Sequence, residues 1–332
     1  LLLVAAGLLN ASAVGAQSPV GHQPDVAVSQ PGRLDWVFAL ANQSPVEPPD
    51  DWLPDYQSTD VRYELYVPPK YNARSKYPLV LFISASDKAA GWKAWQTACE
   101  RQGAIFAAPH GAGNRTDMRQ RLRMVLDVLD DVRRRYAIDT DRTYISGFSG
   151  GARAACAIGM SLPELFGGIV PICAGGDLRQ ETWLRQRVIE RLSVALVTGE
   201  TDFNRGEVER FQGPLLEGVG VRTRVWMVPG LGHGLPPGDT LGEVLTWLNE
   251  AAADRGKLAR QYPASRLDEP LSRQDWSQAL LAEARSRLKS KPTLYSGLMQ
   301  LQGISARWND LPAGQQAGKL LAEYDAGADR SW

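Results

Sequence analysis

Between residues 61 and 253, short apolar segments alternate with longer segments whose apolar residues recur at helical spacing. Residues 79–83 are apolar throughout, as expected of a strand buried on both faces, whereas residues 61–67 alternate as in a half-buried strand. Strands buried on both faces are typical of parallel sheets, because crossover helices then cover each face. The pattern predicts an α/β fold, with a doubly wound, mostly parallel sheet and short right-handed crossovers.

The same pattern sets the order of the expected elements. Strands are expected at 61–67, 79–83, 104–108, 143–146, 168–173, 193–198 and 222–228, and helices at 89–102, 116–136, 150–160, 182–191 and 240–253. Beyond residue 255 the strand pattern stops, and Ser272 and Asp275 form a capping box at the start of a further helix. We therefore expect a main domain at 56–253 and a small all-helical appendage at 254–332.

The first residues differ in character from the rest. Residues 1–9 are almost wholly apolar and residues 11–16 are small, a pattern typical of the end of a secretory signal and shorter than the ~20 residues of a spanning helix. We interpret 1–16 as the remnant of a signal peptide and expect a secreted or periplasmic protein without an integral membrane segment. A mis-started or trimmed N-terminus is the alternative, because an initial Met and a basic segment are missing. Residues 17–55 hold seven of the 21 prolines and are predicted to be an extended linker.

Charge and cysteine content exclude several classes of protein. The 37 basic and 37 acidic residues give a formal net charge of zero, which indicates neither a nucleic acid nor an anionic membrane as partner. The arginines of residues 116–136 are explained by a solvated helix face on which Asp130 pairs with Arg134 and Asp131 with Arg135. Three cysteines form no disulfide scaffold, and the pattern leaves open whether two of them, at positions 156 and 173, are buried thiols or one bridge.

The strongest chemical signal is a G-x-S-x-G sequence at residues 147–151. It follows the predicted strand 143–146 directly and precedes a predicted helix, which is the context of a nucleophilic serine on a tight turn. Small neighbours are needed there, because the backbone is strained and the helix packs closely against the strand. Ser149 is the predicted nucleophile. A glycine-rich turn with an incidental serine is the alternative, and it weakens once partners for the serine are found.

A serine hydroxyl needs a base, and His233 is the predicted one. It stands in the glycine-rich loop 229–234 after the final strand, and it is the only one of three histidines in the expected chain order. His22 falls in the predicted linker. His110 follows the strand 104–108, either as a plain loop residue or as part of the pocket lining.

The residue that orients the histidine is expected after the preceding strand, within residues 198–202. Asp202 is favoured, because a loop of a few residues is needed to bring a carboxylate to the imidazole. Glu200 is the alternative. The residue types and their order therefore predict a triad of Ser149, His233 and Asp202.

With these motifs in place, the chain resembles esterases of the α/β-hydrolase superfamily, especially the secreted poly(3-hydroxybutyrate) depolymerase-like and feruloyl esterase-like branch. The resemblance is carried by residues 77–83, 108–114, 141–151 and 232–234, and it covers roughly residues 56–253. It implies the α/β-hydrolase fold and supports the three triad roles. No metal and no organic cofactor is expected.

One departure from that branch concerns the oxyanion hole. Members often carry a His-Gly motif after the strand equivalent to 79–83, whereas this chain has Ser-Ala-Ser-Asp at 84–87. An oxyanion hole needs the amide after the nucleophile, here Gly150, and a second N–H from the earlier loop. Ala85 and Ser86 are the candidates for that second donor.

The leading functional prediction is hydrolysis of carboxylic esters through an acyl-enzyme intermediate. The segment 175–191 is too short for a large cap domain, so polymeric or carbohydrate-linked esters are candidate substrates. A serine peptidase of the same fold is one alternative. A catalytically weak, hydrolase-like binding protein is another, motivated by the altered oxyanion loop. The oligomeric state stays open.

Overall fold

The computed structural model describes residues 19–34 and 55–328. Its strands form one eight-stranded sheet in the order β1-β2-β4-β3-β5-β6-β7-β8. Pairing is antiparallel between β1 and β2 and between β2 and β4, and parallel throughout the rest. The strands are β1 (Gly21–Ala27), β2 (Arg62–Val67), β3 (Tyr77–Ile83), β4 (Ile105–Pro109), β5 (Ile138–Phe148), β6 (Gly168–Ile172), β7 (Ser193–Gly199) and β8 (Arg222–Val228).

Helices cover both faces of this sheet. The α-helices are α2 (Trp92–Gln102), α3 (Met118–Arg135), α4 (Gly150–Ser161), α5 (Thr182–Arg191), α6 (Arg205–Arg210), α7 (Gly238–Glu250), α8 (Ala252–Gln261), α9 (Arg273–Arg287), α10 (Leu294–Arg307) and α11 (Pro312–Ala326). Side chains of α2 and α7 form one apolar cluster, and those of α3, α4 and α5 belong to another. In β3, Leu81 joins the second cluster and its neighbours Val80 and Phe82 the first, as the two-residue period of a strand requires. The predicted doubly wound, mostly parallel sheet is confirmed, and its strand order is that of the α/β-hydrolase fold.

The parallel strands bring the segments that follow them to one edge of the sheet. Since β3, β5, β6, β7 and β8 run in the same direction, the residues that follow each of them emerge at their shared carboxyl edge. In open α/β sheets this edge is where ligands bind. Every residue predicted from sequence for the site follows one of these strands.

For residues 21–27 the structure differs from the expected linker. This segment is β1, the edge strand that pairs with β2, and Val28 and Leu34 after it are buried in the core. Pro24 is tolerated because β1 is an edge strand whose register shifts between Gln23 and Val26. The predicted signal remnant at 1–16 and most of the remaining linker lie outside the described residues.

The ion pairs predicted for the arginine-rich helix are confirmed, but the prediction that this helix face is exposed to solvent is wrong. Arg134 lies 3.0 Å from Asp130 and Arg135 lies 2.8 Å from Asp131. Both aspartates are nevertheless 1% exposed. The segment after β1 packs across this face of α3, where Arg33 also binds Asp130 at 2.8 Å. The segment that follows β1 therefore supplies a further ion-pair partner to the helix.

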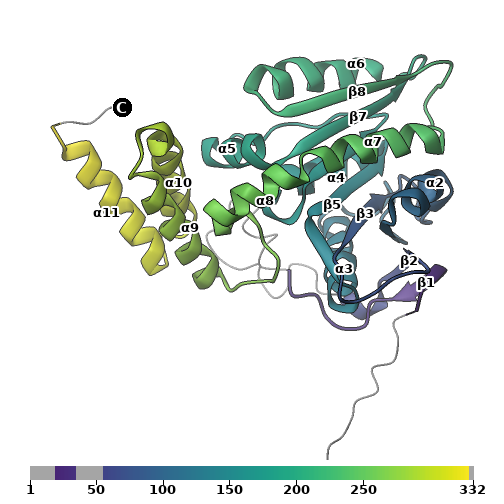
Figure 1. Cartoon of the computed structure of the whole chain (residues 1–332), viewed down its shortest axis with the longest axis horizontal. Helices are drawn as coiled ribbons and strands as arrows, with labels where there is room; N and C mark the ends of the chain where they lie inside the picture. Colours follow the sequence, from purple (N-terminus) through teal and green to yellow (C-terminus); the bar gives the residue numbers. More distant parts are fainter. Residues whose placement is uncertain (1–18, 35–54, 329–332) are drawn as a thin grey trace, which may run out of the picture.

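The last three helices lie together at one end of the molecule, beside α5 and α8 (Figure 1). Ser272 caps α9 by accepting a hydrogen bond from the Asp275 amide at 3.1 Å, which confirms the N-cap of the predicted capping box, and its hydroxyl donates to the Asp275 carboxylate at 2.7 Å. The expected boundary at residue 253 falls inside α8, and Arg255 of that helix donates to the Asp141 carbonyl of β5 at 2.7 Å. The division into two domains stays a prediction.

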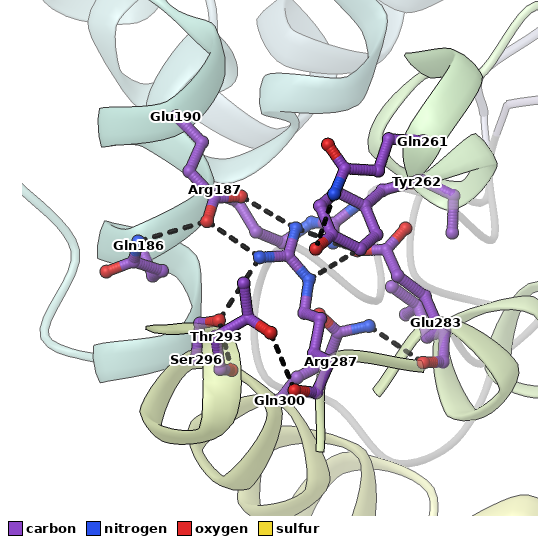
Figure 2. Close-up of polar contacts among 12 residues, drawn as sticks. Gln186, Arg187, Glu190, Gln261, Tyr262, Glu283, Arg287, Thr293, Ser296 and Gln300 are labelled. Carbon is purple, nitrogen blue, oxygen red and sulfur yellow. Dashed lines mark hydrogen bonds and ion pairs between the residues drawn. The ribbon is translucent and has the colours of Figure 1, made fainter. Parts of the chain in front are cut away.

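A buried ionic cluster joins these helices to α5 and to the residues around Glu164 (Figure 2). Arg187 of α5 contacts Glu164 and reaches Glu283 of α9 at 3.2 Å. Arg287 of α9 binds both carboxylate oxygens of Glu190 on α5, at 2.7 and 2.8 Å. We refer to these five residues as the tail cluster. Each arginine in it thus has carboxylate partners from two different helical segments.

The described residues answer the question that the cysteine pattern left open. Cys99, Cys156 and Cys173 are all free and buried, so positions 156 and 173 hold thiols and not a bridge. Among the described helices, none combines the length and the apolar character that crossing a bilayer requires.

Candidate active site

Ser149 occupies a strained turn between β5 and α4. Its backbone has φ 54° and ψ −120°, a conformation that non-glycine residues rarely adopt, and its amide donates to the Ile172 carbonyl at 2.9 Å. A Cβ on Gly147 would lie 2.2 Å from the Gly151 carbonyl oxygen, and one on Gly151 would lie 2.1 Å from that of Ile83. The flanking glycines are therefore required by close packing of α4 against β5 and β3.

His233 connects the serine to an acid. Its Nε2 lies 3.0 Å from the Oγ of Ser149, and its Nδ1 lies 2.7 Å from the Oδ1 of Asp202. The imidazole side chain is 17% exposed, whereas the Asp202 side chain is fully buried. The structure thus brings together the three side chains predicted from sequence, each from a different loop.

Asp202 is held as a carboxylate by several donors. Burial by itself raises its pKa, but hydrogen bonds from the Asn204 amide, then from His233 and Thr198, outweigh burial and lower the pKa below its ordinary value. The Asn204 amide lies 3.0 Å from Oδ1, and Thr198 Oγ1 donates to Oδ2 at 2.8 Å. Asp202 is accordingly ionised at neutral pH and orients Nδ1–H of the imidazole.

Glu200, the alternative acid, has a different position. Its Oε2 accepts a hydrogen bond from the Gly230 amide at 2.9 Å, at the start of the histidine loop. In the same contact the Thr201 amide donates to the Leu231 carbonyl at 3.0 Å. A Cβ on Gly199 would lie 2.1 Å from that carbonyl oxygen, so only glycine permits this approach. Glu200 therefore fixes the loop that carries His233 and does not contact the imidazole.

Cys173 lies beside the same carboxylate, which the sequence did not indicate. Its Sγ donates to the Gly234 carbonyl at 3.3 Å, and burial, followed by the Asp202 carboxylate, raises its pKa to about 12. Cys173, Asp202 and His233 place ligand-type atoms within 4.8 Å of one another. A metal there would need a thiolate and a free imidazole nitrogen. The neutral thiol and the two hydrogen bonds of His233 fit a proton relay better.

Two phenylalanines flank the imidazole. The ring of Phe203 stacks on His233 with centroids 4.0 Å apart, and Phe148 approaches it at 5.0 Å. Phe203 is 78% exposed, so its outer face is open to a ligand. Nothing in the sequence distinguished Phe203 except its place directly after Asp202.

The loop after β3 contains the candidate oxyanion donors. The Ser86 amide already donates to the Ser84 Oγ at 3.1 Å. The Ala85 carbonyl accepts from the Asn114 amide at 2.9 Å, while the Ala85 N–H meets no acceptor among the described residues. Gly150 begins α4, where the first amides of a helix have no intrahelical acceptor. Of the predicted donors, the N–H groups of Gly150 and Ala85 have no acceptor within the described part of the chain, whereas that of Ser86 is bonded to Ser84.

Arg121 of α3 holds the loop after β3 in place, a role that the sequence did not indicate. Its Nη2 donates to the Ser84 carbonyl at 2.9 Å, and the residue is 3% exposed. Within the described ranges no carboxylate lies at ion-pair distance from it, and burial lowers the pKa of its guanidinium. A buried positive charge with no carboxylate partner among the described residues thus lies next to the candidate oxyanion loop.

The other two histidines lie elsewhere. The Ala89 amide donates to Nδ1 of His110 at 3.1 Å, and Nε2 of the same ring lies 2.9 Å from the Pro24 carbonyl. His22 on β1 contacts Glu64 at 2.9 Å. His110 therefore ties two loops to β1, as a loop residue, and is not part of the Ser149 constellation.

No protein-family model matches the sequence, and no curated protein matches it. Among solved structures, the chain is similar to a thermostable esterase at 22% identity and a TM-score of 0.44, over 57% of this chain and 59% of that one. An S-formylglutathione hydrolase from Staphylococcus aureus is similar at 12% identity and a TM-score of 0.46, over 57% of this chain and 92% of that one. An acetyl xylan esterase from Aspergillus awamori is similar at 15% identity and a TM-score of 0.42, over 57% of this chain and 94% of that one. This chain spans about three fifths of the esterase named first, and its α/β-hydrolase fold rests on its own strand order.

Proposed function

We propose that this protein is a serine hydrolase that cleaves carboxylic esters. The observation that carries the proposal is the continuous hydrogen-bonded chain from the Ser149 hydroxyl through His233 to Asp202, at 3.0 and 2.7 Å. It is supported by the strained backbone of Ser149, which presents the hydroxyl at the carboxyl edge of the sheet. These are the geometric requirements of an activated serine nucleophile.

The proposed reaction has two halves. His233 takes the proton of Ser149 as the Oγ attacks the ester carbonyl, and it returns that proton to the leaving alcohol when the tetrahedral intermediate collapses. Water, activated by the same imidazole, then hydrolyses the acyl-enzyme. Asp202 keeps Nδ1 protonated throughout, so that Nε2 faces the serine.

The oxyanion would be bound by the amides of Gly150 and Ala85. Ala85 is favoured over Ser86, because the Ser86 N–H is already bonded within the loop. Arg121 would assist through its hydrogen bond to Ser84, which fixes the loop, and through its positive charge, which favours negative charge developing nearby. This arrangement compensates for the missing His-Gly motif.

Labelling with a fluorophosphonate probe tests the proposal. The probe should label the folded protein, and the modified peptide should contain Ser149. Ser149→Ala should abolish labelling, whereas Ser75→Ala, which removes an exposed loop hydroxyl, should leave it unchanged. A folded protein that resists labelling would instead favour a hydrolase-like binding protein.

A second measurement separates ester from amide hydrolysis. Turnover of a short-chain nitrophenyl ester should exceed that of a peptide anilide, and the reverse order would assign a peptidase. Export is the remaining part of the proposal and rests on the apolar residues 1–9 and the small residues 11–16. Expression with its leader in a bacterial host, followed by N-terminal sequencing of the periplasmic fraction, tests it.

A further inference from the structure

The loop after β4 packs against the loop that carries the candidate oxyanion donors. Because β4 runs parallel to β3, residues 110–117 emerge at the same carboxyl edge of the sheet. A Cβ on Gly113 would lie 2.3 Å from Oδ1 of Asp87 and 2.6 Å from its amide nitrogen, so only glycine permits this approach. The Arg115 guanidinium binds the Asp87 carboxylate at 2.5 Å. The residues on both sides of Asn114 are therefore in contact with the loop after β3.

Asn114 itself lies between the two predicted amide donors. Its backbone amide donates to the Ala85 carbonyl at 2.9 Å. Its side chain lies against Gly150, because a Cβ at residue 150 would be 2.0 Å from Oδ1 and 2.8 Å from Nδ2 of the carboxamide. Residue 150 is the variable position between the serine and the last glycine of G-x-S-x-G, so the motif does not require glycine there. Here the Asn114 carboxamide takes the space that a side chain would need.

The Asn114 carboxamide is also free to bind a ligand. Among residues 19–34 and 55–328 it has no hydrogen-bond partner, and Asn114 is exposed. The polar side chains that follow it are already bonded: Arg115 to Asp87, Thr116 to the Gly111 carbonyl at 2.5 Å, and Asp117 to the first amides of α3. A carboxamide carries two N–H donors. An unpaired donor group thus lies in contact with the residue that follows the nucleophile.

We propose that Nδ2 of Asn114 donates a third hydrogen bond to the oxyanion, in addition to the amides of Gly150 and Ala85. This inference rests on the proposed function, because the oxyanion forms only when Ser149 attacks a carbonyl. The terminal torsion of an asparagine side chain is broad, so the carboxamide can turn its N–H toward the developing charge. A donor that binds the oxyanion more strongly than the neutral carbonyl raises kcat and leaves KM nearly unchanged.

Two variants of Asn114 test the proposal with nitrophenyl acetate as substrate. Asn114→Ala should lower kcat by about 10² to 10³ and change KM by less than about threefold. Asn114→Asp keeps the shape of the side chain but replaces the donor by a negative charge at about pH 8, so its kcat should be lower still. Asn309→Ala, at an exposed position between α10 and α11, is the matched control and should keep the wild-type kcat.

A boronic acid inhibitor separates hydrogen-bond donation from a structural role. Its tetrahedral adduct with the serine is a negatively charged analogue of the reaction intermediate. If Asn114 binds the oxyanion, the Ki of the inhibitor should rise in the Asn114 variants by about the factor by which kcat/KM falls. Urea unfolding of the same preparations should show no matching loss of stability.

A double-mutant cycle tests the contact with Gly150. Gly150→Ala places a methyl group where the Asn114 carboxamide lies and should displace it, so that kcat falls about as far as in Asn114→Ala. The double variant should fall little further, because the carboxamide is already gone. Fully additive losses would show that Asn114 does not act from its place beside Gly150.

Three other results would overturn the inference. In the first, Asn114→Ala keeps kcat within about threefold of wild type. In the second, Asn114→Asp is more active than Asn114→Ala, which would indicate that only the shape of the side chain matters. Both results leave the proposed function intact, provided that the wild type turns over the ester and is labelled by the fluorophosphonate. In the third, the wild type does neither, which would overturn the inference and the proposed function together.

Discussion

Buried arginines occur in two regions of this protein, and they differ in what neutralises them. In the tail cluster, Arg187 is paired with Glu164 and Glu283, and Arg287 with Glu190. Burial alone lowers the pKa of each guanidinium, but the carboxylates outweigh it and raise the pKa of both arginines. Below the candidate oxyanion loop, Arg121 is equally buried but donates to a carbonyl, and its pKa is lowered.

The difference indicates two uses of the same side chain. A paired, hydrogen-bonded arginine makes a rigid junction with little net field, and removing one partner leaves an uncompensated buried charge. An arginine without a counterion lowers stability where it stands, yet its field acts on any negative charge that forms nearby. Substitutions in the tail cluster should therefore change mainly stability, and substitutions around Ser149 mainly turnover.

The largest effect is expected at the nucleophile. Ser149→Ala should lower kcat by about 10⁴ to 10⁶, because triad members act as a unit. The free energy of unfolding should stay constant or rise slightly, because the substitution removes one hydroxyl and leaves the strained backbone at residue 149 and the packing around it in place. Ester turnover and urea unfolding of the same preparation measure both. Activity within tenfold of wild type would remove Ser149 from the mechanism.

Arg121→Met should lower kcat by about 10²-fold with a much smaller change in KM, because the loop that offers the Ala85 amide loses its support and the site its positive charge. Arg121→Lys retains the charge and should recover part of the activity. Arg119→Met, at an exposed position of α3, is the matched control. If Arg121→Met unfolds more easily but keeps the wild-type kcat per folded molecule, the two arginine regions do not differ in function.

Glu283→Gln tests the other side of the comparison. It removes a carboxylate that contacts both Arg187 and Arg287, and should lower the free energy of unfolding by about 3 kcal/mol. Activity per folded molecule should not change. Urea unfolding measures the effect against Glu323→Gln, an exposed position on α11. Loss of turnover without loss of stability would make the tail cluster part of the catalytic apparatus.

The smallest effect is a pH dependence from Asp202. Its pKa is lower in the folded protein than its ordinary value of 3.8, so its contribution to stability is complete above 3.8 and is lost as the pH falls through the lower folded value. Unfolding free energies measured from about pH 6 to pH 2 should decline more steeply for the wild type than for Asp202→Asn. Parallel curves would show that the donors around Asp202 do not stabilise its charge.

Much of the fold and the order of the candidate site residues follow from local pattern. Continuous apolar runs such as 79–83 identify buried strands, and a polar residue directly after such a strand has to lie at the carboxyl edge. For this reason Ser149, Asp202 and His233 could be selected from their places in the sequence. The distances of 3.0 Å from His233 to Ser149 and 2.7 Å from His233 to Asp202 could not be predicted in this way, because two loops must turn back across the edge of the sheet.

The sequence by itself determined the succession of strands and helices from residue 61 to residue 253 and the loops that carry the polar residues, because side-chain periodicity records which face of each element is buried. Only the tertiary structure decided which N–H group of the loop after β3 is already bonded: that of Ser86 donates to Ser84, whereas that of Ala85 meets no acceptor among the described residues. It also decided that Arg121 contacts this loop and that residues 21–27 complete the sheet. Arg121 and Ser84 are 37 residues apart in the chain. Contacts between segments so distant depend on how whole elements pack, and no local period encodes them.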